Sequence, residues 1–259
     1  MKITFIFHSS FLIECEKSYL LFDYYQGELP ALDPEKPVYV LASHQHYDHF
    51  SPGVFQMVKK YPKCTFLLSD DIPETLVSEA TKELGESPKI LRMQEGSRLV
   101  LMPETGDHRI LSEGEAFPKA DPGSVRVTGF PSTDLGLSYL VETEGRRIFH
   151  AGDLNDWWWP NEWKSRNETM QADYFRILNS LKETLDGEML DVVFHPMDPV
   201  LGVGEYRGPV EFLERIAVRH FFPMHMWERY SVGTRFLEVY PEYEEVFCPI
   251  SGAGQEFTV

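Results

Sequence analysis

The chain has 259 residues, of which 42% are apolar and 25% charged, so it can bury a core of ordinary globular size. Its formal net charge of −17 weighs against nucleic acid as a partner, because contacts with phosphates require clustered lysine and arginine. No apolar run is long enough to cross a membrane, polar residues interrupt the N-terminal segment too early for a secretion signal, and the three cysteines are widely spaced. We therefore expect a cytoplasmic protein with reduced thiols.

The first part of the chain predicts closely spaced strands. Short β-branched and aromatic runs at 3–7, 11–14 and 19–23 are separated by polar breaks and indicate an antiparallel meander. A continuous apolar run at 38–42 is typical of a buried strand. A Ser-Pro pair at 51–52 then marks the start of a helix, because serine caps helices well and proline fits their first turn.

Strands and helices are expected to alternate through the rest of the chain. Apolar runs predict strands at 65–68, 90–93, 97–102, 125–128, 137–142, 147–149, 190–194, 221–224 and 256–259. Helices are expected at 52–61, 70–85, 169–185 and 209–218 and around Arg235, with loops at 24–37, 103–122 and 154–168. Because no linker rich in Gly or Ser divides the chain, we expect one domain, 1–259, in which two sheets pack together with helices outside.

The strongest chemical signal follows the strand at 38–42. There the segment Ser43-His44-Gln45-His46-Tyr47-Asp48-His49 gathers three imidazoles and one carboxylate. Imidazole binds zinc, iron, copper and nickel, and a carboxylate adds harder ions such as manganese. One ion rarely takes four ligands so close in sequence, whereas two adjacent ions could divide them, with His44 and His46 on one and Asp48 and His49 on the other. The pattern predicts a metal site.

Two later strands end in further residues of ligand type. Asp153 follows the strand at 147–149, and its two carboxylate oxygens could each take one ion, although an aspartate in a turn after glycine is common. His225 follows the strand at 221–224 and lies between two methionines, where a histidine more often belongs to the core. It gains weight as a ligand because the first cluster leaves its second ion short of donors.

Together these segments resemble the metallo-β-lactamase superfamily, and within it the metal-dependent hydrolases related to L-ascorbate-6-phosphate lactonase. The likeness covers almost the whole chain in the expected order. It rests on five segments: 8–14, 21–23, 44–49, 150–153 and 223–225. The resemblance implies the α/β (α+β) class and a four-layer αβ/βα sandwich of two mixed sheets, with the active site at one edge of the paired sheets.

The resemblance also implies a ligand set. His44 and His46 would bind the first ion, Asp48, His49 and His225 would bind the second, and Asp153 would bridge them. Such families normally supply one more histidine to the first ion, but the segment 131–136 contains none. Asp134 is the candidate replacement, with Ser132 and Thr133 as poorer donors. We expect one or two divalent ions, zinc in the first place, and manganese or iron because a carboxylate makes the first site harder.

Other residues are candidates for the surroundings of the ions. His8 and Asp23 are expected to orient the ligands by hydrogen bonds, although a polar pair near a turn would leave the same pattern. His195 and Asp198 follow the strand at 190–194 and could reach the rim of the site. Trp157 begins a run of three tryptophans that could form a wall of the pocket or anchor its loop to the helix near Met170.

These features favour a metal-dependent hydrolase of a small ester, lactone or phosphoester, in which a metal-bound hydroxide attacks. Asp48 would orient the nucleophile and transfer a proton. A phosphodiesterase or nuclease is the alternative within hydrolases, and oxygen chemistry at a non-haem iron site lies outside them. The third alternative is a binding or sensing protein with a degenerate first metal site, and the missing histidine supports it. The expected partner is a small molecule, and a homo-oligomer stays open.

Overall fold

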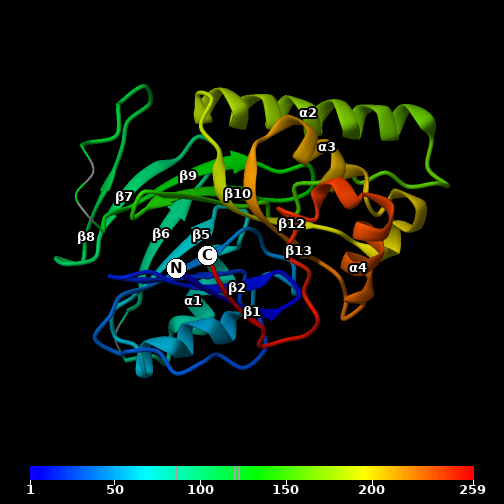
Figure 1. Cartoon of the computed structure of the whole chain (residues 1–259). Coiled ribbons are helices and arrows are strands. Elements are labelled where there is room, and N and C mark those ends of the chain that lie inside the picture. Colours follow the sequence, from blue (N-terminus) through cyan, green and yellow to red (C-terminus); the bar gives the residue numbers. More distant parts are fainter. Residues whose placement is uncertain (86, 120, 122) are drawn as a thin grey trace.

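Two seven-stranded sheets form the centre of the structure, a computed structural model that describes residues 1–85, 87–119, 121 and 123–259 (Figure 1). The first sheet has the strand order β14 (Glu256–Thr258), β1 (Lys2–Phe7), β2 (Ser10–Glu14), β3 (Tyr19–Phe22), β4 (Val38–Ala42), β5 (Cys64–Ser69) and β6 (Lys89–Met93). The second has the order β13 (Val218–Met224), β12 (Leu190–Pro196), β11 (Arg146–His150), β10 (Leu137–Thr143), β9 (Val125–Pro131), β7 (Arg98–Met102) and β8 (Asp107–Ile110).

Both sheets are mixed, as predicted. Strands β1, β2 and β3 form the expected antiparallel meander, and β3 to β6 then pair in parallel. In the second sheet β7 to β11 pair antiparallel, including the hairpin between β10 and β11, and β11 to β13 pair in parallel. The C-terminal strand β14 lies at the edge beside β1. Strand β8 falls inside the predicted loop 103–122 and corrects it; its four residues are exposed, so they lack the burial alternation that marks a strand.

Helices cover the outer faces of the sheets (Figure 1). The 3₁₀ helix η1 (Pro52–Lys59) and α1 (Glu74–Thr81) pack on the first sheet, and α2 (Lys164–Leu185) and α3 (Arg207–Arg215) pack on the second. The remaining helical segments are η2 (Pro199–Gly204), α4 (Ser231–Val239) and η3 (Pro241–Tyr243). This arrangement confirms the predicted four-layer sandwich. No helix in the described part of the chain is long and apolar enough to cross a membrane.

The inner faces of the two sheets share one core. Phe11 of β2 stacks on Phe194 of β12 with ring centroids 4.0 Å apart. The hydroxyl of Tyr139 on β10 donates a hydrogen bond of 2.9 Å to the carbonyl oxygen of Ala42 at the end of β4. Because Tyr139 is fully buried, this bond fixes how the end of β4 lies against the second sheet.

The loops that carry the candidate ligands meet at one edge of this sandwich. The backbone N–H of Leu137 donates to the carbonyl oxygen of Ser43 at 2.9 Å, which joins the start of β10 to the loop after β4. Gly136 makes this approach possible, since its φ is +66° and an added Cβ would lie 2.0 Å from that same oxygen. The N–H of His225 donates to the carbonyl oxygen of His8 at 3.2 Å, which joins the ends of β13 and β1.

Candidate metal centre

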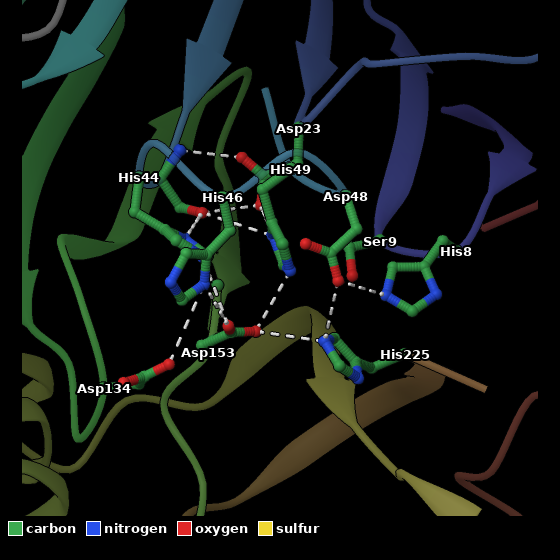
Figure 2. A network of polar contacts seen from close by, with 12 residues as sticks. His8, Ser9, Asp23, His44, His46, Asp48, His49, Asp134, Asp153 and His225 are labelled. Atoms are coloured by element: carbon green, nitrogen blue, oxygen red, sulfur yellow. Dashed lines mark hydrogen bonds and ion pairs between the residues drawn. The ribbon is translucent and has the colours of Figure 1, made fainter. Parts of the chain in front are cut away.

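Seven histidine and aspartate side chains converge at this edge in two groups (Figure 2). One group consists of His44, His46 and Asp153, and the other of His8, Asp48, His49 and His225. Within each group the candidate donor atoms lie within 4.8 Å of one another. The structure therefore brings together every predicted ligand except Asp134, and it adds His8.

Asp153 lies between the two groups and turns one oxygen to each. Its Oδ2 is 3.2 Å from Nε2 of His44 and 3.7 Å from Nδ1 of His46. Its Oδ1 is 3.1 Å from Nε2 of His49 and 3.5 Å from Nε2 of His225. This placement is the one that a carboxylate bridging two ions requires.

Local backbone structure explains why these side chains share a small volume. After β4 the chain forms a tight turn in which the N–H groups of His49 and Phe50 donate to the carbonyl oxygen of His46, at 3.0 and 2.9 Å. Asp153 follows β11 through Gly152, which has φ +54°; an added Cβ there would lie 2.7 Å from a backbone oxygen of β10. Both segments follow strands that end at the same edge, so their side chains meet.

Buried carboxylates fix the orientation of two of the histidines. Nδ1 of His49 donates to Oδ2 of Asp23 at 2.7 Å, and the other oxygen of Asp23 accepts from the N–H of Ser43, also at 2.7 Å. Nδ1 of His225 donates to Oδ2 of Asp198 at 2.9 Å. In both rings Nε2 is left to face the centre. A carboxylate that accepts from the other ring nitrogen commonly orients a metal-binding histidine in this way.

The ionisable groups of the centre strongly affect one another's pKa values. Burial opposes ionisation of Asp153, but the positive charges of His49 and His225 outweigh it and hold its pKa well below the usual range. Burial also opposes a charge on His49, yet Asp153 and Asp23 together raise its pKa well above the usual value. A cation bound here would take over the role of that proton, so we expect metal binding to release it.

The residues present fit a divalent ion. Nε2 of His49 and Oδ1 of Asp153 are buried and, although 3.1 Å apart, lack the geometry of a hydrogen bond. Both ring nitrogens of buried His8 also have no hydrogen-bond partner among the described residues. Unsatisfied buried donors and acceptors cost free energy, and a ligated ion is a common reason for them. Imidazole and carboxylate together suit zinc, manganese and iron.

His8, which the sequence predicted to orient other ligands, lies within the second ligand group. Its Nε2 lies 3.4 Å from Oδ2 of Asp48, and its ring centroid is 4.2 Å from that of His225. Burial, only partly offset by Asp48, lowers the pKa of His8 to about 4, so its imidazole is neutral and able to ligate at neutral pH. His8 lies in the turn between β1 and β2, where its φ is +53°.

Two further predicted residues do not belong to either ligand group. Asp134 is at the rim, with its Oδ2 3.9 Å from Nδ1 of His46 and 49% of its side chain exposed. His195 does not reach the rim and corrects that expectation. It is fully buried, with Nε2 2.8 Å from the hydroxyl of Tyr174 on α2, because its side chain projects from β12 toward the helices.

A cavity of about 350 Å³ opens beside the centre. Its walls are formed by residues of the centre, by two tryptophans and by the start of α2: His46, Asp48, Thr133, Asp134, Asp153, Trp157, Trp159, Arg166, Met170, Asp198 and His225. Trp157 therefore lines the pocket, with its ring centroid 5.6 Å from that of His225. Larger cavities of about 490 and 650 Å³ lie elsewhere and are not lined by the ligand groups.

Comparison with known families agrees with this geometry. Residues 12–226 match the model of the beta-lactamase superfamily domain, so the chain belongs to that family. The predicted membership of the metallo-β-lactamase superfamily is thereby confirmed, whereas the lactonase-like subgroup stays a prediction.

Individual relatives are distant. A UPF0173 metal-dependent hydrolase from Nanoarchaeum equitans is 26% identical over 155 residues, which are 59% of this chain and 60% of that one, so the match spans about three fifths of the relative. Igni18, a metallo hydrolase from Ignicoccus hospitalis, has a TM-score of 0.62 at 14% identity and covers 100% of this chain and 98% of its own. CmlA, a diiron β-hydroxylase from Streptomyces venezuelae, has a TM-score of 0.60 at 10% identity, covering 100% and 54%. The structural likenesses show the shared fold.

Proposed function

We propose that the protein is a metal-dependent hydrolase that cleaves a small ester, lactone or phosphoester with water as the nucleophile. The observation that carries this proposal is Asp153, whose two oxygens lie 3.2 Å and 3.1 Å from histidines of different ligand groups. The names of the curated relatives support the same class of reaction. The fold is shared with a metallo hydrolase and with a diiron hydroxylase.

Each residue has a role in this proposal. His44, His46 and Asp153 would hold one ion, with Asp134 moving in from the rim as its fourth donor. Asp48, His49 and His225 would hold the other, together with Asp153 and with His8 as an additional ligand. Bound ions of this kind lower the pKa of water and polarise the oxygen of the substrate.

Asp48 is the proposed residue for proton transfer. Burial opposes its ionisation, but His8, whose Nε2 lies 3.4 Å from Oδ2 of Asp48, and the charges of His49 and His225 lower its pKa to about 2. It is therefore ionised at neutral pH and can orient a water molecule by accepting a hydrogen bond from it. Asp48 also lines the cavity, so a substrate bound there lies within its reach.

Metal content and hydrolysis together test the proposal. Protein purified without chelators should contain about two ions per chain and should hydrolyse members of a panel of small esters, lactones and phosphoesters. Asp134→Ala should lower the content toward one ion, whereas Asp107→Ala, at an exposed position on β8, should leave it unchanged. Fully loaded protein that cleaves none of these compounds would reject a hydrolase, and iron with oxygen consumption would indicate oxidative chemistry instead.

A further inference from the structure

The cavity beside the metal centre has a preformed apolar part, to which Trp157, Trp159 and Met170 contribute. The indole N–H of Trp157 donates to the carbonyl oxygen of Asp153 at 2.8 Å, so this ring is tied to the centre itself. Asn167, buried on α2, accepts from the N–H of Trp159 at 3.1 Å and donates to its carbonyl oxygen at 2.8 Å. The tryptophan loop is therefore held against the start of α2.

That same start of α2 places a positive charge at the cavity. Arg166 is the only lysine or arginine among the described residues that line it, in a chain with a formal net charge of −17. Its Nη1 donates to Oε2 of Glu162 at 2.9 Å, and a guanidinium has further N–H donors in the same plane. With 75% of the side chain exposed, the guanidinium of Arg166 is accessible to a ligand.

The acidic residues that line the cavity are Asp48, Asp134, Asp153 and Asp198, and Asp134 lies beside His46 at 3.9 Å. Asp48 and Asp153 belong to the ligand groups, and Asp198 bonds to His225. A ligand that fills this cavity would contact residues of the metal centre, the indole rings and the guanidinium of Arg166. The volume of about 350 Å³ is near the lower limit for small-molecule sites and fits a single ring with short substituents.

We infer that the substrate carries an anionic group, in the simplest case a carboxylate, at the end remote from the bond that is cleaved. Arg166 binds this anion, and the tryptophan rings contact the flat apolar body between the two ends. Guanidinium matches carboxylate in geometry, which gives specificity as well as affinity. This inference rests on the proposed hydrolase function, since it places the cleaved bond at the metal centre.

Two probes of equal shape test the inference by binding alone. 4-Carboxyphenylphosphonate and 4-carbamoylphenylphosphonate share a phosphonate for the metal centre and differ only in the charge at the far end. Titration of the metal-loaded protein, followed by tryptophan fluorescence, should show that the carboxylate probe binds about fivefold more tightly. Arg166→Gln should abolish this preference, and Trp159→Leu should weaken both probes by the same factor.

Arg176→Gln is the matched control, because Arg176 lies on the same helix, is paired with exposed Asp173 and does not line the cavity. It should keep the preference of the wild type. Equal binding of the two probes by wild type, binding of neither, or a preference that survives Arg166→Gln would overturn the inference. An Arg166-dependent preference without turnover of any panel compound would reject the hydrolase proposal and keep the anion site.

Discussion

Several residues in or next to the metal centre have a positive φ, a backbone conformation that residues other than glycine rarely adopt. His8, Asp23, His225 and Trp227 all have positive φ, at 53°, 43°, 64° and 50°. Such a conformation costs about 1–3 kcal/mol per residue and persists only where the surroundings enforce it. Here the hydrogen bond from His225 to the backbone of His8 and the bonds of Asp23 supply that constraint. The strain is therefore concentrated where ligands have to be held in place.

His8 gives a prediction at this scale. His8→Phe keeps a ring in the same space but removes both nitrogens, so we expect the second ion to bind at least about tenfold more weakly. Competition with a fluorescent chelator measures that affinity, and the visible spectrum of the cobalt-loaded protein reports the change in coordination. Tyr25→Phe is the control, since Tyr25 contacts the ring of His8 and does not belong to either ligand group. An unchanged affinity in His8→Phe would show that His8 does not ligate.

The sequence predicted some of these residues and missed others for physical reasons. The cluster from His44 to His49 is visible because its ligands are neighbours in the chain. Asp153 and His225 were found because each follows an apolar strand. Arg166 carries no such signal: it is one charge on a polar helix, and only the folded loop at Trp159 brings the cavity to it.

At the scale of elements, the loop after β11 is held by two helices. Asn167 of α2 binds its far end, and Arg207 of α3 binds Asp156 in its middle, with Nη2 2.9 Å from Oδ2. The Asp156 carboxylate is fully buried, and burial outweighs Arg207 and raises its pKa. The same loop begins at Asp153, so helix packing outside the sheet positions a residue of the metal centre.

Removal of Arg207 should therefore destabilise the protein. Arg207→Leu leaves the Asp156 carboxylate buried without its cation, which we expect to cost about 1–3 kcal/mol at pH 7. Since the pKa of Asp156 is already raised and would rise further, its protonated form is favoured in the folded state, and the loss should shrink as the pH falls toward 4. Urea unfolding at the two pH values measures both effects.

Arg176→Leu is the comparison for this experiment, because Arg176 pairs only with exposed Asp173 at 3.6 Å and should contribute little. A loss in Arg207→Leu that is the same at both pH values would point to lost packing of the Arg207 stem rather than to an unpaired charge.

Most elements were predictable because apolar runs mark buried strands. Helix α2 begins at Lys164, five residues before the predicted start. Its N-cap residue is Trp163, whose side chain makes no capping hydrogen bond, so the sequence has no capping signal at this position. Segment 52–59 is a 3₁₀ helix, and the Ser-Pro signal at its start does not distinguish this from an α-helix. Strand β8 has four exposed residues and no burial pattern.

At the scale of the whole molecule, the ligands come from both sheets. His8, Asp48 and His49 follow strands of the first sheet, and Asp153 and His225 follow strands of the second. The sequence indicated the strands and the meander of β1 to β3, but not distant pairings such as that of β1 with β14, because these join residues far apart in the chain. Ions bound by all of these residues would link the two halves of the sandwich.

Metal removal should consequently lower the stability of the entire fold. An ion present at about a thousand times its dissociation constant adds roughly 4 kcal/mol, which for a chain of this size corresponds to a change in Tm on the order of 10 °C. Calorimetry with and without a chelator measures the difference, and adding the metal back should restore it. A Tm that does not respond to the chelator would mean that the ions, if bound, do not join the sheets.

The separation of the ligands along the chain also has a consequence during synthesis. The first ligands are made within the first fifty residues, but His225 emerges only after β13 has been translated. Domains fold as their sequence becomes available, at about 5–20 residues per second. The growing polypeptide must therefore carry exposed histidines and carboxylates for many seconds before it can complete the centre. Both ligand groups can therefore be completed only late in synthesis, once strands of both sheets have been made.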